Sequence, residues 1–109
     1  MENEEKLIND AKELLRLISA VCDEMQTLFK SSHDSITACA DMIYTFANPD
    51  IVKILVHCWS SNHLDWDDYN QLSSPIIIAS MYKCLFFIYT TFDSKVAHTF
   101  LTALAEKVS

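Results

Sequence analysis

The segment from His57 to Gln71 carries two histidines, a cysteine and three aspartates, which are residue types that bind metal ions. A zinc site usually places its Cys and His ligands two to four residues apart, or at i and i+4 on one helix face. His57 and Cys58 are adjacent, so on a helix their side chains point about 100° apart. The aspartates resemble the start of a calcium loop, but that loop needs Gly at its sixth position and Glu at its twelfth, where this chain has Asn70 and Ile76. We therefore predict no metal site here and no cofactor.

The same segment has a simpler interpretation as an acidic connector between two helices. Asp65 can cap a short helix that carries Trp66 and Tyr69, and a Ser-Pro pair at positions 74–75 then starts the next helix. Aromatic residues among aspartates suit contact with a basic or aromatic-accepting partner, so Trp66 and Tyr69 are candidate partner-binding residues. The alternative is a solvated loop with Trp66 tucked into the core.

Catalytic chemistry has little support in the sequence. Histidines occur at positions 33, 57, 63 and 98, but no Ser or Cys stands in a recognisable nucleophile motif with an orienting acid. The chain has no glycine, which excludes phosphate-binding loops, dinucleotide fingerprints and the nucleophile elbow, because those turns need a residue without a side chain. We predict that the protein is not an enzyme.

The composition indicates one helical domain that spans residues 1–109. Half of the residues are hydrophobic and 21% are charged, which is a globular balance. The formal net charge is −7, and the Lys and Arg residues are spread thinly without a basic run. Nucleic acid is therefore not an expected partner, and an anionic membrane surface is disfavoured for the same electrostatic reason.

The four cysteines, at positions 22, 39, 58 and 84, lie far apart, and each falls within an apolar helical pattern. An even number permits disulfides, but the opening MENEEKLIND does not have the charged and then apolar leader of a secreted chain. We expect reduced, mostly buried thiols and an intracellular protein, cytoplasmic or nuclear.

The run Ile76–Phe92 is the only candidate for a membrane span. It has about seventeen residues where about twenty are needed, and Lys83 lies near its middle. In a soluble protein, a helix that is apolar on nearly all sides belongs in the middle of a bundle. We predict that this segment does not span a membrane and that the other helices surround it.

Apolar periodicity and turn signals predict an all-α fold. Apolar residues at three of every seven positions predict a first helix over residues 3–30. The residues that can start the later helices are Ser32 or Asp34, Asn48 with Pro49, Ser74 with Pro75, and Asp93 or Ser94. The fold class that we expect is a compact bundle of five to six helices.

Shifted by 45 residues, the chain shows an internal echo in which CADMIYTFANPDIV, from Cys39, aligns with CLFFIYTTFDSKVA, from Cys84. Each copy is expected to form a helix, a short turn and a second helix. In spacing and layout, residues 35–104 resemble armadillo and HEAT repeats, whose units of about 40 to 47 residues stack helix pairs into scaffolds for peptides and partner proteins. The resemblance implies two stacked helical hairpins as an alternative to a compact bundle.

The first predicted helix carries the feature most suited to binding. Its apolar stripe is wide enough both to cover the bundle and to present a seam to a homodimer or to another helix, with plain core burial as the alternative interpretation. The candidate partner-binding residues on this stripe are Leu7, Ala11, Leu14, Ile18, Val21 and Met25.

We therefore expect a non-catalytic protein-interaction module, an adaptor or scaffold, that buries an apolar helix face or groove against another protein or an amphipathic helix. One alternative is a specific inhibitor, immunity or chaperone protein, for which small acidic helical chains are common vehicles. In architecture, a bundle around a hydrophobic helix is also similar to viral mimics of the helical cell-death regulators, whose groove binds an amphipathic helix. The glycine-containing groove motif of that family is missing here.

Overall fold

The structure is a computed structural model that describes residues 2–29, 32–61 and 75–109. Nearly all of these residues are helical, and none of them lies in a strand. The helices are α1 (Glu2–Phe29), α2 (His33–Phe46), α3 (Pro49–Ser60), α5 (Pro75–Thr91) and α6 (Ser94–Val108). The predicted all-α bundle of five to six helices is therefore confirmed.

Side-chain caps start the helices where the sequence predicts them. The side chain of Asn48 accepts a hydrogen bond of 3.0 Å from the Asp50 N–H, and Pro49 occupies the first turn of α3. The sequence offered two possible capping residues each for α2 and α6. Ser32 caps α2, and Asp93 caps α6. Each cap satisfies a backbone N–H that the helix itself leaves without a partner.

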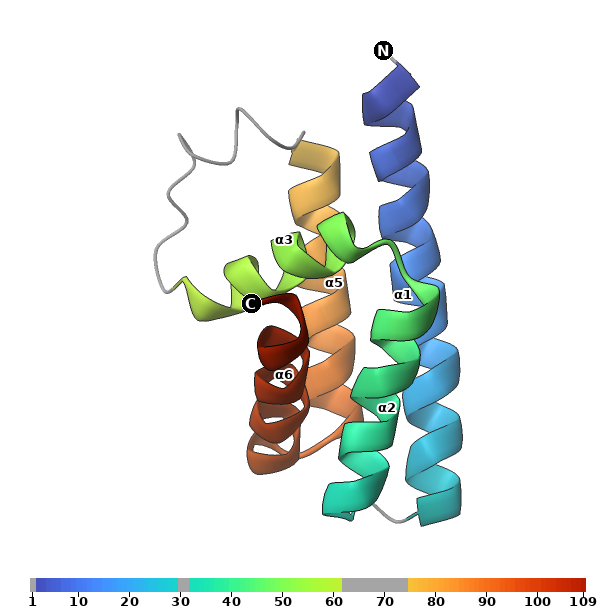
Figure 1. The fold of residues 1–109 in the computed structure, drawn as a ribbon, viewed down its shortest axis with the longest axis vertical. Helices are drawn as coiled ribbons and strands as arrows, with labels where there is room; N and C mark the ends of the chain where they lie inside the picture. Colours follow the sequence, from blue (N-terminus) through green and yellow to red (C-terminus); the bar gives the residue numbers. More distant parts are fainter. Residues whose placement is uncertain (1, 30–31, 62–74) are drawn as a thin grey trace.

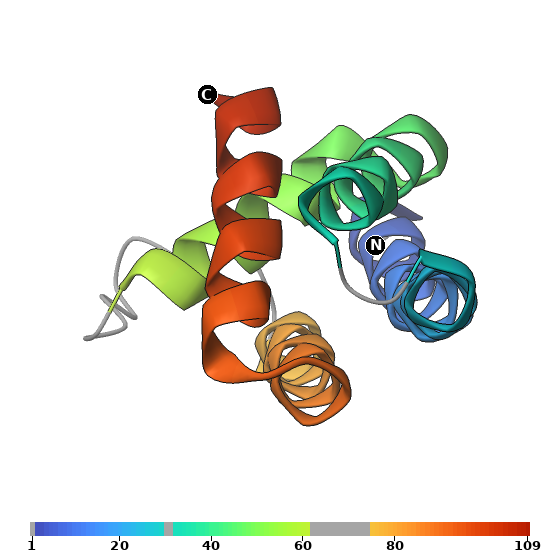
Figure 2. The same cartoon turned by 90° about the horizontal axis from the view of Figure 1, so that it is seen from below.

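The helices form two sets that cross each other. In Figure 1, α1 and α5 run along the long axis of the molecule, and α3 passes across the front of α5. Seen from below in Figure 2, α1, α2 and α5 appear nearly end-on, whereas α3 and α6 lie across the view. The most extensive packing joins α1 to α5 and α2 to α6, and α3 packs against both α5 and α6. Helices that are distant in the sequence therefore hold the fold together.

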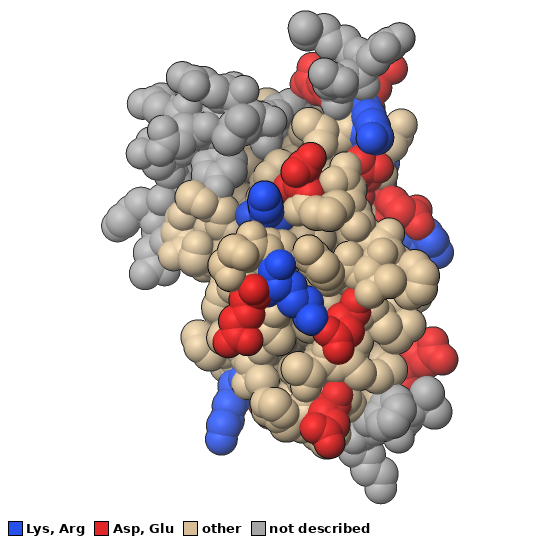
Figure 3. All heavy atoms as spheres, viewed as in Figure 1, with Lys and Arg blue, Asp and Glu red and all other residues tan. Residues whose placement is uncertain are grey.

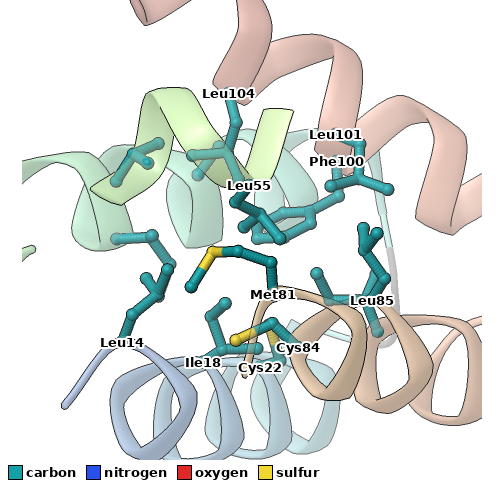
Figure 4. Packing of buried hydrophobic residues seen from close by; sticks show 14 of the residues in the cluster. Leu14, Ile18, Cys22, Leu55, Met81, Cys84, Leu85, Phe100, Leu101 and Leu104 are labelled. Atoms are coloured by element: carbon teal, nitrogen blue, oxygen red, sulfur yellow. The ribbon is translucent and has the colours of Figure 1, made fainter. Parts of the chain in front are cut away.

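All five helices contribute to one hydrophobic core. Figure 4 shows Met81 of α5 lying between Leu14 and Ile18 of α1 and Leu55 of α3, with Phe100 of α6 beyond it. Each of these five side chains is at most 1% exposed. Burial of an aliphatic or aromatic side chain contributes roughly 1.5 to 3 kcal/mol, so this contact region is a main source of stability.

The prediction that other helices surround α5 is wrong. One side of α5 is buried, but Ile76, Tyr82, Phe86 and Tyr89 are exposed. The reason is that α1, α3 and α6 pack against only part of its circumference. None of the described helices combines the length and the apolar character that crossing a bilayer requires.

The predicted state of the cysteines is confirmed, since Cys22, Cys39, Cys58 and Cys84 are all free thiols and all buried. Burial raises the pKa of the Cys58 thiol to about 11 and that of the Cys84 thiol to about 12, because a low-dielectric core disfavours the thiolate. Both groups therefore stay protonated in the folded protein at pH values where an unfolded chain would lose these protons.

We expect the protein to lose stability as the pH rises from about 8.5, the ordinary thiol pKa, towards the folded-state values of Cys58 and Cys84. The raised folded pKa means that the stabilising effect is complete below pH 8.5. By pH 10 each of the two thiols should weaken the fold by up to about 2 kcal/mol. Urea unfolding at pH 7 and pH 10 measures the change. The double variant Cys58→Ala, Cys84→Ala should show a smaller pH dependence, and an unchanged dependence would contradict this account.

Candidate functional site

Helix α5 carries a second apolar face besides the one that it buries. Tyr82, Phe86 and Tyr89 are spaced by four and three residues, which places them on the same side of a helix. They are 42%, 73% and 42% exposed, and Phe86 is the most exposed large hydrophobic side chain among the described residues. Core packing does not account for exposed aromatic residues at these positions.

Two side chains from neighbouring helices extend this face. The indole Nε1–H of Trp59, near the end of α3, donates a hydrogen bond of 3.1 Å to the Tyr89 hydroxyl. The Trp59 ring also meets the His98 ring of α6 edge-on, with 5.4 Å between the ring centres. We call the set Trp59, Tyr82, Phe86, Tyr89 and His98 the aromatic surface.

Helix α5 contributes little charge to the aromatic surface. Helix α5 has no Asp or Glu, and Lys83 is its single charged residue. The pKa of the Tyr82 hydroxyl is raised, first by burial and then by the nearby Cys58, so this group keeps its proton, and can donate a hydrogen bond, to a higher pH than a free tyrosine. A set of aromatic rings with hydroxyl, indole and imidazole groups at its rim is typical of protein-binding surfaces, where one part of a side chain is desolvated and another keeps a polar contact.

Charges elsewhere are mixed. On the face drawn in Figure 3, basic side chains lie among acidic ones and do not gather into one positive area. Lys107 of α6 forms an ion pair with Asp41 of α2 and lies 5.9 Å from the centre of the Tyr44 ring. Lys107 therefore makes its charged contacts within the same chain, and these contacts hold the end of α6 against α2.

The candidate partner-binding residues of the first helix lie mostly inside the bundle. Leu7 is partly buried against the core. The other five are between 0% and 8% exposed, and they are Ala11, Leu14, Ile18, Val21 and Met25. Core burial, the alternative interpretation of this stripe, accounts for their pattern, and a partner could reach these five only if α1 separated from the helices packed against it, α2, α3 and α5. Trp66 and Tyr69 lie outside the described residues.

Two of the histidines share one groove. His33 and His98 line a groove of about 280 Å³ between α2 and α6, together with Glu106 and several threonines. The hydroxyls of Thr37 and Thr99 donate to backbone carbonyls one turn earlier in their own helices. They are therefore not arranged as nucleophiles beside a base. Within residues 2–29, 32–61 and 75–109, no three His, Cys, Asp or Glu side chains come together as a metal site.

The sequence contained a signal for the aromatic surface, but apolar periodicity alone does not show whether those residues are buried or exposed. Residues 75–91 are apolar on more sides than one buried face needs, and the surplus includes Tyr82, Phe86 and Tyr89 at helical spacing. Such a surplus indicates either complete burial or a second contact face. The packing of α1, α3 and α6 against only part of α5 excludes complete burial.

Comparison of the chain with models of known protein families, with curated proteins and with solved structures finds no match. The armadillo and HEAT resemblance stays a prediction. Its aligned positions have similar surroundings, since Cys39 and Cys84 are both buried, as are Ile43 and Ile88.

Two Phe→Ala variants test whether the aromatic surface serves the fold. Phe86→Ala removes a side chain that is 73% exposed and should change the free energy of unfolding by less than about 0.5 kcal/mol. Phe100→Ala removes a side chain that is 0% exposed and should cost about 3 to 5 kcal/mol. Urea denaturation of both proteins gives the comparison. A loss at Phe86 as large as that at Phe100 would mean that Phe86 is a structural residue.

Proposed function

We propose that this chain is a non-catalytic protein-interaction module that binds a partner protein through the aromatic surface. The observation that carries the proposal is the exposure of Phe86 between two half-exposed tyrosines, on a helix without a carboxylate. Monomeric proteins seldom keep such apolar groups together in water, because burying them against a partner is favourable.

The geometry suits a binding hot spot. Phe86 lies in the middle of its stripe, and Trp59 is held in place by its bond to Tyr89 and its contact with His98. Binding residues that are already ordered lose less conformational freedom when a partner docks. Tyr and Trp are also the residue types that most often dominate the energy of protein interfaces. The aromatic surface therefore takes the place of the α1 stripe as the expected contact.

The narrower alternatives differ in their partner. An inhibitor or chaperone would cover the aromatic surface with one specific protein, whereas a mimic of the cell-death regulators would hold an amphipathic helix in a groove. The groove between α2 and α6 is lined mainly by Thr, His and Glu side chains, which do not suit the apolar face of a helix. The aromatic surface fits an adaptor or inhibitor better than a groove binder.

A photo-crosslinking amino acid in place of Phe86 tests the proposal in the cells that produce the protein. The matched control is the same replacement at Phe46, which is 67% exposed on α2 and outside the aromatic surface. Irradiation should give a discrete adduct with another polypeptide chain from position 86 and little or none from position 46. Equal labelling from both positions, or adducts at position 86 only within the same chain, would contradict the proposal.

A second variant measures how much the surface contributes. With the photo-crosslinker at Tyr82, the additional change Phe86→Glu places a charge in the centre of the contact. Loss of one central aromatic residue typically costs about 2 kcal/mol, roughly 30-fold in Kd, so the adduct should almost disappear. The circular dichroism spectrum and thermal midpoint of Phe86→Glu should match those of the unchanged protein, because the side chain lies outside the core.

A further inference from the structure

Two thiols from different helices meet inside the bundle. Cys22 of α1 and Cys39 of α2 are 0% and 1% exposed. The two side chains interact closely enough for each thiol to shift the pKa of the other, with a side-chain hydrogen bond between them as the first cause. The Cys39 thiol in turn donates to the backbone carbonyl oxygen of Val21, with 3.7 Å between Sγ and O. That carbonyl belongs to the residue directly before Cys22, so the two cysteines lie next to each other where α1 packs against α2.

We propose that Cys22 and Cys39 are a modification site, at which a peroxide converts the two thiols into a disulfide that ties α1 to α2. The thiolate of Cys39 attacks one oxygen of hydrogen peroxide, the O–O bond breaks, and the products are a sulfenic acid and hydroxide. The Cys22 sulfur then attacks the sulfenic sulfur, and the S–O bond breaks. Overall, two thiols and one hydrogen peroxide give one disulfide and two waters, so the cysteines are oxidised and the peroxide is reduced.

The four thiols are not equivalent towards such a reagent. The thiolate is the reactive form, and the hydrogen bond from Cys22 lowers the pKa of Cys39. The pKa of Cys22 is raised, first by that same bond, and burial raises the pKa values of Cys58 and Cys84. Cys39 is therefore the favoured site of first attack, and Cys22 is the thiol placed to resolve the product.

Burial limits the rate of the oxidation and the size of the oxidant that can reach the two sulfurs. Because both sulfurs are enclosed, reaction requires a small oxidant or a brief opening between α1 and α2. Bulky thiol reagents should react slowly with the same two residues in the folded state. The disulfide closes a loop of about 17 residues, which reduces the freedom of the unfolded chain and should raise the thermal midpoint by roughly 5 to 15 °C.

The distribution of lysines makes the test direct. Cleavage after Lys and Arg places the four cysteines in four separate peptides, covering residues 17–30, 31–53, 54–83 and 84–95. The full-length protein is treated with hydrogen peroxide, its remaining thiols are blocked, and the digest is analysed by mass spectrometry without reduction. We expect peptide 17–30 joined to peptide 31–53, at the summed mass less two hydrogens, and its loss after dithiothreitol.

Variants separate the pair from the other thiols. Cys58→Ala with Cys84→Ala should keep the cross-link and the rise in thermal midpoint, whereas Cys39→Ala should abolish both. Circular dichroism before and after oxidation confirms that the helices persist. If the main product joins another pair of peptides, if Cys39 stops at a sulfinic acid, or if all thiols remain unreacted while free glutathione is oxidised in the same tube, the proposal is overturned.

Discussion

The chain contains no glycine, so its helices have to end without the left-handed glycine cap that many helices use. Ala47 ends α2 in extended backbone, at φ −92° and ψ 158°, while its N–H still bonds to the Ile43 carbonyl oxygen at 2.9 Å. Asn48 follows at once and caps α3. A turn this short leads α3 away from α2 and across α5, and the crossed arrangement of the bundle depends on it.

The crossed arrangement determines which side of α5 meets water. Because α1 lies along α5 while α3 and α6 cross it, these helices cover only part of its circumference and leave Tyr82, Phe86 and Tyr89 exposed. The same crossing brings Trp59 from the end of α3 and His98 from α6 to the border of that face.

Local chemistry made much of the fold predictable. Asn48 with Pro49 fixes a helix start through hydrogen bonds within a few residues, and the α1 stripe fixes a helix through its period. Whether Ile18 faces the core or a partner depends on where α5 lies, which no local pattern contains. The contact between Cys22 and Cys39 likewise depends on the register between two helices. The choice between two apolar faces of α5 is a tertiary property, so the sequence predicted the helix and not its exposed side.

The pairing of α1 with α5 joins segments that residues 30–74 separate in the chain. A ribosome adds about 5 to 20 residues per second, so the stripe of α1 precedes its main covering helix by roughly 2 to 9 seconds. In that interval α2, which follows directly and packs beside α1, can shield only one flank of the stripe. The nascent chain, more than the folded protein, is therefore the form that exposes Leu14 and Ile18 to aggregation and to chaperones.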